Sequence, residues 1–385
     1  ILENQAVVIR GNRIAALGPS QHISLPENAK VIHGRGAFLM PGLSDMHIHT
    51  NLNWRNTHVW KTCPLYLYLA NGVTTIRCFG PRGGDKKYAL GWKTKIRKGL
   101  WPGPRVYAGG PILFGPVKNP RKTVLDQVSA GFDFIKLYSY LSKQEFDEIM
   151  ETARQANIYT AGHIPFQVGL KEVISQGLDE IAHIEELAWE LFLFDKNKPI
   201  RGQGWLSHVK KMAYKQYRVL YSSLTDKALE DLFKPRMLQM ANSIKASGIP
   251  VCTTLFLDEI ILEKLFEPEK FLSRPENRYL PGQYIQGFKK GKEKHLAMFK
   301  GGRDFAGFKH KIDLLLLNCL KKRGVRLILG TDSGSGRMGL APGFSLHDEL
   351  RILTENGFSP YEAIKTGTVN AAMAAEKMNG SGDFG

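Results

Sequence analysis

The 385-residue sequence predicts an α/β fold, specifically a (β/α)8 TIM barrel, and two observations support this prediction. Eight apolar, strand-like runs follow one another from residue 43 onward, and amphipathic stretches with helical spacing separate most of them. Parallel strands that alternate with helices, eight times over, are typical of this barrel. A doubly wound sheet is the competing fold, but no glycine-rich phosphate-binding turn follows the first run.

The predicted strands are short runs rich in apolar side chains, at residues 43–50, 73–80, 104–113, 134–140, 159–164, 180–184, 249–256 and 326–334. The clearest helix covers residues 142–157. Ser142 and Glu145 have the spacing of a capping box, and an apolar stripe follows them. The stretches 122–131 and 170–177 each end in glycine, as the C-terminus of a helix often does.

The first 41 residues predict part of a small β-sandwich domain. Residues 7–18 have the pattern of a hairpin with a Gly-Asn turn, and residues 29–42 predict another short β-segment. Residues 380–385 form a turn that we expect to lead back to this domain, while residues 42–379 form the barrel. We expect the sandwich to be truncated at both chain ends, so that a signal peptide would not be visible.

Two insertions interrupt the alternation, at about residues 189–225 after the sixth strand and 257–307 after the seventh. Loops that follow barrel strands lie on the C-terminal face, over the active site. The insertions therefore predict a lid or part of a substrate pocket, with simple surface decoration as the alternative.

The net charge of +17 is concentrated in one region of the chain. Between Lys196 and Arg323 there are 26 Lys and Arg against 12 Asp and Glu, which accounts for +14 of the total. Such a region forms either a solvated cationic surface or a funnel toward an anionic substrate or membrane surface. No helix-turn-helix, zinc-finger or RNP-like motif accompanies it, so we expect no nucleic-acid partner.

Composition also limits the class of protein. No apolar run approaches the roughly 20 residues that span a bilayer, so no membrane span is predicted. We expect a soluble protein, cytoplasmic or, after removal of a signal peptide, secreted or periplasmic. The cysteines are scattered without a CxxC pair, which argues against a zinc finger and a disulfide-dependent fold: Cys63, Cys78, Cys252 and Cys319.

Six side chains of metal-site type lie at the C-terminal ends of predicted strands: His47, His49, Lys136, His163, His183 and Asp332. His47 and His49 are two residues apart and therefore share one strand face. Each residue also has a structural explanation: an edge strand for the histidine pair, a structural hydrogen bond for each single histidine, a salt bridge to Asp133 or a neighbouring carboxylate for Lys136, and an Asx turn for Asp332. Their common register on one rim favours a metal site. The remaining histidines lack this register and are predicted to be structural: His22, His33, His58, His208, His295, His310 and His347.

The segments DMHIHT, FIKLY, AGHIP, AHIEE and GTDSG together resemble the amidohydrolase superfamily, whose hallmark is the HxH pair of the first strand. The resemblance spans nearly the whole chain and is greatest to the prolidase-like and imidazolonepropionase-like branch. It implies that His47, His49 and Asp332 hold one divalent metal ion, that His163 and His183 hold a second, and that Lys136 bridges them as a carbamate derived from carbon dioxide. Imidazole and carboxylate ligands suit zinc best, with manganese, cobalt or iron as alternatives.

The resemblance also implies a mechanism. Two metal ions share a hydroxide and polarise a carbonyl, and Asp332 carries the proton from water to the leaving amine. Tyr138, two residues beyond Lys136, would donate to the substrate carbonyl. The loop with Arg274, Arg278 and Tyr279 would clamp a substrate carboxylate.

The function predicted on this basis is a binuclear metal-dependent hydrolase of C–N bonds, either Xaa-Pro dipeptidase-like or an N-acyl amino acid amidohydrolase. Its substrate would be a small, carboxylate-bearing molecule. A mononuclear ring-opening hydrolase or deaminase of the imidazolonepropionase type is the alternative, and a catalytically inactive binding protein is a third. The sequence leaves open whether the chain forms a homo-oligomer.

Overall fold

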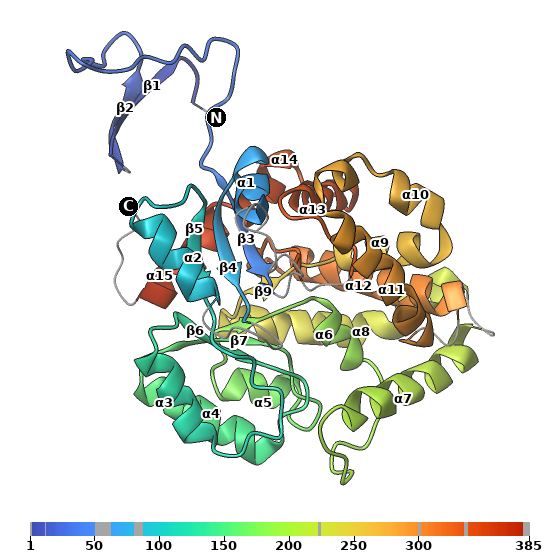
Figure 1. Ribbon diagram of the computed structural model, residues 1–385. Helices are drawn as coiled ribbons and strands as arrows, with labels where there is room; N and C mark the ends of the chain where they lie inside the picture. Colours follow the sequence, from blue (N-terminus) through green and yellow to red (C-terminus); the bar gives the residue numbers. More distant parts are fainter. Residues whose placement is uncertain are drawn as a thin grey trace.

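All eight predicted runs contain a strand in the structure, a computed structural model that describes residues 2–11, 13–50, 63–80, 88–221, 225–298, 302–334 and 338–379 (Figure 1). The strands are β3 (Leu43–Ile48), β4 (Val73–Cys78), β5 (Arg105–Ala108), β6 (Phe134–Leu137), β7 (Tyr159–Gly162), β8 (Glu180–Ile181), β9 (Val251–Cys252) and β10 (Leu327–Ile328). The predicted α/β class with parallel strands is confirmed.

These strands form two parallel sheets. One has the order β3-β4-β5 and the other the order β10-β9-β8-β7-β6. Isolated parallel bridges pair Ile48 with Ser333 and Gly109 with Phe134, and thus connect β3 with the turn after β10, and the end of β5 with β6. No continuous ladder crosses either junction among the described residues.

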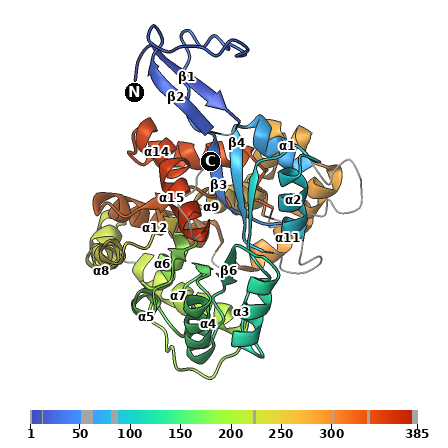
Figure 2. The same ribbon diagram turned by 90° about the vertical axis from the view of Figure 1, so that its left-hand side faces the viewer.

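Helices follow most of the strands and lie around the sheets (Figures 1 and 2). Helix α4 (Lys143–Gln155) has the predicted capping box between Ser142 and Glu145, and it buries the predicted apolar stripe. The other helices of this layer are α1 (Cys63–Ala70), α2 (Tyr88–Arg97), α3 (Pro120–Ser129), α5 (Leu170–Ser175), α6 (Glu185–Trp189), α13 (Phe344–Glu355), α14 (Pro360–Thr366) and α15 (Val369–Asn379).

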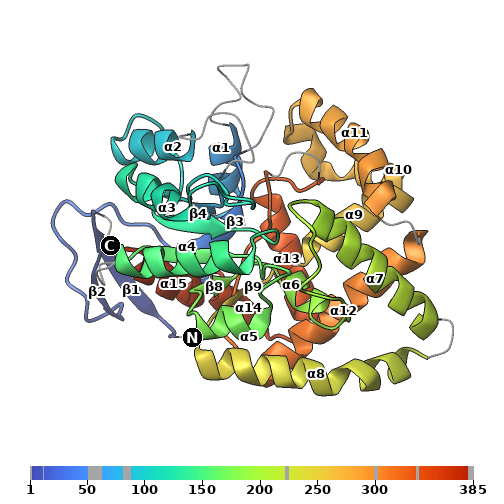
Figure 3. The same cartoon turned by 90° about the horizontal axis from the view of Figure 1, so that it is seen from below.

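The two insertions fold into helices with buried sides. Trp205 and Tyr217 of the first insertion, and Phe288 of the second, are buried in the main hydrophobic core. The α-helices between α6 and β10 are α7 (Gly204–Tyr221), α8 (Asp226–Ser247), α9 (Phe256–Phe266), α10 (Pro268–Ser273), α11 (Gly282–Met298) and α12 (Gly302–Lys322). Helices α10 and α11 pack against α9, and the three lie together in Figure 3.

The N-terminal segment contains the predicted hairpin, formed by the antiparallel strands β1 (Gln5–Arg10) and β2 (Arg13–Pro19). Asn12 of its turn, like the C-terminal residues 380–385, lies outside the described residues. The predicted β-segment at 29–42 is wrong, because no strand forms there. Ile32 and Phe38 in this stretch are each more than 80% exposed, and an extended segment without a neighbouring strand makes no ladder.

Candidate metal centre

The end of β3 and the turn after β10 bring three metal-binding side chains together. His49 Nε2 lies 2.9 Å and His47 Nε2 lies 3.6 Å from Asp332 Oδ1. All three side chains are buried, and their ligand atoms lie within 4.8 Å of one another. These three side chains could together hold one divalent cation.

The turn that carries Asp332 is fixed by hydrogen bonds to β3. The backbone N–H of Asp332 donates to the carbonyl of His47, and that of His49 donates to the carbonyl of Ser333, both at 2.7 Å. Gly334 passes so close to the His49 carbonyl that a Cβ at this position would lie 2.0 Å from the oxygen. Asp332 itself has a φ of 63°, a left-handed conformation that a non-glycine residue holds only when its surroundings impose it.

The strands β7 and β8 bring two further histidines to the same place. The ring centroids of His163 and His183 are 4.8 Å apart, and that of His183 lies 4.3 Å from the ring of His47. His183 and Thr254, which follow β8 and β9, have φ values of 71° and 54° and thus share the unusual conformation of Asp332.

A second layer of hydrogen bonds orients three of the four imidazoles. The Nδ1 atoms of His49, His163 and His183 lie 3.0, 2.5 and 2.8 Å from the Gly80 carbonyl, Glu186 Oε1 and Thr254 Oγ1. Glu186 also accepts from the backbone N–H of Ile164 at 3.0 Å. Since each Nδ1 is engaged, the Nε2 atom is the one that remains to bind a metal.

Lys136 reaches the same cluster from β6 and is only 1% exposed. Its Nζ lies 4.6 Å from the centroid of Phe79, and that ring stacks on His47 at 3.7 Å. Asp133, which the sequence offered as a salt-bridge partner of Lys136, accepts from Lys93 Nζ at 2.5 Å. Of the six predicted rim residues, His47, His49 and Asp332 have ligand atoms within 4.8 Å of one another, while the rings of His163 and His183 and the Phe79 contact of Lys136 lie next to them.

The state of His47 shows that the cluster suits a metal. Burial, together with the nearby charges of His183 and Lys136, holds the pKa of His47 well below its usual value, so the imidazole is neutral. Neutral imidazole is the form that binds metals. Among the described residues, neither ring nitrogen of this buried side chain has a hydrogen-bond partner. A buried polar group is normally satisfied, and a metal ion at Nε2 would satisfy this one.

A buried ion pair next to the cluster was not predicted. Arg77 donates to Glu180 at 2.8 Å and to the carbonyl of Met46 at 2.8 Å, and Tyr159 donates to Glu180 at 3.1 Å. Arg77 and Glu180 are completely buried. Because Met46 directly precedes His47, this pair helps to fix the strand that carries the two histidines.

Sequence reasoning also missed the supporting residues Glu186, Thr254 and Asp45. Asp45 accepts from Thr331 N at 3.1 Å and Thr331 Oγ1 at 2.7 Å, and so joins β3 to the turn of Asp332. Asp45 had a visible signal, since it lies two residues before His47 on the same strand face. Glu186 had none, because nothing distinguishes it from the adjacent Glu185.

Tyr138 was predicted to be catalytic, and Arg274, Arg278 and Tyr279 were predicted to bind substrate. The ring of Tyr138 lies 4.2 Å from that of His163, at the edge of the cluster. Arg274 is engaged by three carboxylates, those of Glu276 at 2.6 Å, Asp348 at 2.8 Å and Glu263 at 3.2 Å.

The remaining two members of the expected clamp contact each other. Arg278 donates to the hydroxyl of Tyr279 at 2.7 Å, and both side chains are exposed. Tyr279 also stacks on Phe344 with ring centroids 5.6 Å apart.

Three of the predicted structural histidines contact groups outside this cluster. His208 lies against Trp205, with ring centroids 6.1 Å apart. His310 is 3.7 Å from Glu259, and His347 Nε2 is 2.9 Å from the carbonyl of Asn71. His58 lies outside the described residues.

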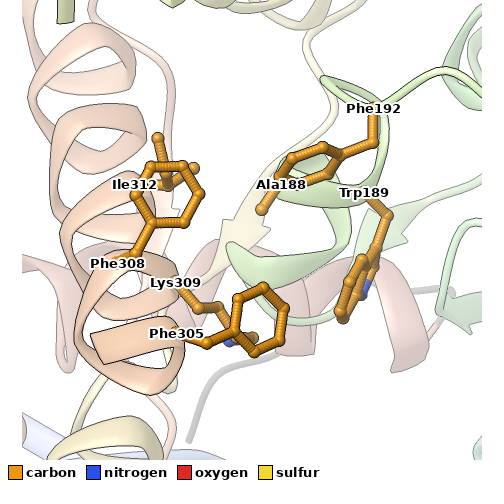
Figure 4. A pocket seen from close by; sticks show the side chains of 7 residues that line it. All are labelled: Ala188, Trp189, Phe192, Phe305, Phe308, Lys309 and Ile312. Atoms are coloured by element: carbon orange, nitrogen blue, oxygen red, sulfur yellow. The ribbon is translucent and has the colours of Figure 1, made fainter. Parts of the chain in front are cut away.

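A small apolar pocket lies between α6, which follows His183, and α12 (Figure 4). Trp189, Phe192, Phe305 and Phe308 line it, with Lys309 among them. Lys309 Nζ lies 2.9 Å from Glu185, 3.0 Å from Asp258 and 2.8 Å from Asp313, and so ties α12 to α6 and α9. A pocket with this apolar lining is a gap in the packing between α6 and α12.

Solved structures show what this chain resembles. A Xaa-Pro dipeptidase with bound methionine in its active site matches with a TM-score of 0.60 at 18% identity, over 99% of this chain and 86% of that one. A bottromycin amidohydrolase matches with a TM-score of 0.63 at 19% identity, over 96% of this chain and 72% of that one. The chain has an amidohydrolase fold.

Phenylurea hydrolase B also has this fold, with a TM-score of 0.59 at 18% identity, over 96% of this chain and 83% of that one. No protein-family model and no curated protein matches the sequence. None of the helices within the described ranges has the length and apolar character required to cross a membrane.

Proposed function

We propose that this chain is a metal-dependent hydrolase of C–N bonds with a binuclear centre. The observation that carries the proposal is His47, a fully buried neutral imidazole without a hydrogen-bond partner among the described residues, surrounded by Asp332, His49 and His183. In this proposal, the ligands are the six rim residues: His47, His49, Lys136, His163, His183 and Asp332.

The proposed frame is a closed (β/α)8 barrel over residues 42–379, with residues 1–41 and 380–385 belonging to a small β-sandwich. The isolated bridges from Ile48 to Ser333 and from Gly109 to Phe134 support closure, since they join the edge strands of the two sheets. Closure would bring the C-terminal ends of all eight strands onto one rim.

The proposed division of ligands follows the two groups of side chains. His47, His49 and Asp332 would hold one ion, His163 and His183 the other, with zinc as the expected metal. Lys136 would bridge the two ions. Two divalent cations beside its buried amine would favour the conversion of that amine to an anionic carbamate. When bound, such a pair of ions supplies Lewis acidity toward an amide carbonyl and acidifies a water molecule.

The side chains of this protein would perform the remaining steps. Asp332, whose Oδ1 faces both histidines of β3, would take the proton from water and deliver it to the leaving amine. Tyr138, beside His163, would donate its hydroxyl proton in a hydrogen bond to the substrate carbonyl.

The proposed substrate is a small amide with a carboxylate, such as a Xaa-Pro dipeptide or an N-acyl amino acid. One neighbour is named as a Xaa-Pro dipeptidase and another as a phenylurea hydrolase, so the fold accommodates different C–N substrates. Arg278 and Tyr279 are the candidates for carboxylate binding. We do not extend this role to Arg274, because three carboxylates already balance its charge.

The decisive experiment is elemental analysis of protein purified without chelators. We expect about two transition-metal ions per chain, and hydrolysis within a panel of dipeptides and N-acyl amino acids. Lys136→Met should lower the metal content and reduce the rate by a factor of at least about 100, because it removes the bridging ligand. Lys143→Met, at an exposed lysine of α4, is the matched control and should change neither value.

A metal content near zero in the unmodified protein would overturn the proposal. One firmly bound ion, unchanged by Lys136→Met and accompanied by ammonia release from a cyclic substrate, would instead establish the imidazolonepropionase-type alternative.

A further inference from the structure

Tyr284, on helix α11 of the second insertion, connects that insertion to the turn that carries Asp332. Its side chain is 2% exposed, and its ring packs on Phe288 with centroids 4.3 Å apart. The hydroxyl donates to the carbonyl of Leu340 at 3.0 Å, and the backbone N–H of Gly334 donates to the hydroxyl. One phenol oxygen thus joins two points of the chain on the C-terminal side of Asp332.

On its opposite side the turn is bonded to β3 and to Tyr68 of α1, whose hydroxyl lies 2.7 Å from Ser333 Oγ. Thr331 is bonded to Asp45, Asp332 to the carbonyl of His47, and Ser333 to the N–H of His49. Tyr284 adds a contact from an element nearly fifty residues earlier in the chain, in a separate part of the fold. Asp332 therefore sits between two independent supports.

The segment 338–340 also rests on the second insertion. Lys264 Nζ on α9 donates to the carbonyl of Met338 at 3.1 Å. A Cβ at Gly339, which has a φ of 110°, would lie 3.0 Å from Phe271 and 3.2 Å from Ile260. Leu340 is also buried, so the segment 338–340 packs against α9, α10 and α11.

We infer that Tyr284 is a positioning residue for Asp332, and that the second insertion serves as part of the frame of the metal site. The inference rests on the proposed function, because it assigns to Tyr284 the task of holding a ligand and proton carrier of that site. Asp332 holds a left-handed φ of 63°, a conformation that persists only under external constraint, and the Tyr284 hydroxyl supplies one such constraint.

The protonation state of Tyr284 is suited to this task. Burial, and the charge of Asp332, raise the pKa of its hydroxyl above the ordinary value, while the Gly334 hydrogen bond opposes the rise. The hydroxyl therefore remains protonated throughout the neutral range and can donate to Leu340 while it accepts from Gly334.

Tyr284→Phe tests the inference, since it keeps the aromatic packing and removes only the hydroxyl. The metal-stripped variant is titrated with Co²⁺, whose visible absorption reports the geometry of its ligands. We expect an altered spectrum and an affinity for the Asp332-containing site about 10-fold to 100-fold weaker, as for other losses of supporting hydrogen bonds at metal sites. On a substrate found in the panel, kcat should fall by a similar factor with KM nearly constant.

Tyr217→Phe is the matched control. Tyr217 is a buried tyrosine of the first insertion, packed among Tyr214, Phe305 and Phe308, and its variant should retain the Co²⁺ spectrum of the unmodified protein. Far-UV circular dichroism and thermal unfolding confirm that both variants are folded.

The outcomes separate this inference from the proposed function. If the unmodified protein binds no Co²⁺, the proposed function fails. If it binds Co²⁺ and folded Tyr284→Phe has the same spectrum and affinity, only the role of Tyr284 is overturned. A change of equal size in Tyr217→Phe would also overturn it, because the effect would then be one of general packing.

Discussion

The two halves of the metal cluster are supported in different ways. On the side of β3 and β10, backbone groups hold the ligands: the Gly80 carbonyl orients His49, and the His47 carbonyl holds Asp332. On the side of β7 and β8, side chains do so, with Glu186 on His163 and Thr254 on His183. The first half is thus fixed by the path of the chain, and the second by residues that substitution can remove.

The difference shows which residues can be substituted to change how the metal ligands are held. The Gly80 and His47 carbonyls offer no side chain to vary, so changes in the first half must act through residues that hold the turn of Asp332, such as Asp45 and Tyr284. The second half depends on α6 and on the start of α9, and these segments are tied together by the charged cluster around Lys309. Substitutions that act on that cluster should therefore affect the second half alone.

Lys309→Met should have the largest effect on stability. Burial alone would lower the pKa of Lys309, but the charges of Asp258, Asp313 and Glu185 raise it well above its ordinary value, so the ammonium is charged. Its loss leaves buried carboxylates without their cation and should lower the free energy of unfolding by about 3–5 kcal/mol. Urea denaturation measures this value. A loss as small as that of an exposed lysine pair, such as Lys122→Met, would show that the cluster does not join α6 to α9.

Glu186→Gln should have an intermediate effect, confined to one metal ion. The amide keeps the shape of the side chain but changes the hydrogen-bonding character of the group that lies 2.5 Å from His163 Nδ1. We expect the affinity for the second ion to fall about 10-fold to 100-fold and that for the first to stay constant. Calorimetric titration of metal-stripped protein with Zn²⁺ resolves the two steps, and an equal loss at both would contradict the independence of the halves.

Glu349→Gln should have the smallest effect, visible as a pH dependence. Glu349 accepts from the N–H groups of Leu255 and Phe256 at 2.9 and 2.7 Å, next to Thr254, and burial raises its pKa to about 7. A carboxyl with a raised folded-state pKa stabilises fully below its unfolded pKa, and this contribution is lost as pH rises through 7.

The excess stability of the unmodified protein over Glu349→Gln should therefore decrease between pH 4.5 and pH 7, by at most about 1.4 kcal/mol per pH unit. Urea denaturation of both proteins across this range measures the difference. A difference that is constant with pH would mean that Glu349 stays ionised when folded.

The sequence was sufficient to locate the strands and the rim residues, because both depend on local patterns. Apolar runs mark the strands, and His47, His163 and His183 mark where they end. The predicted runs at 180–184 and 249–256 are longer than β8 and β9, which end at Ile181 and Cys252. His183 and Thr254, which have left-handed backbone conformations, lie two residues beyond these strand ends. No residue preference in the sequence indicates these conformations.

Long-range partners were beyond prediction for a physical reason. Arg274 pairs with Asp348 across 74 residues, and a free cation cannot be told from a paired one without the fold. The contact of Tyr284 with Leu340 spans 56 residues and depends on the seating of an entire inserted helix. Local patterns encode which residue stands at a strand end, while tertiary packing decides what supports it.

Asp332, His183 and Thr254 hold three of the five left-handed conformations found at non-glycine positions in the described chain. Each such residue costs about 1–3 kcal/mol relative to a relaxed one. Glycine at any of them would relieve this strain while removing a ligand or its support. The strained conformations at the rim therefore lower the stability of the fold in exchange for the positions of the ligands and their supports.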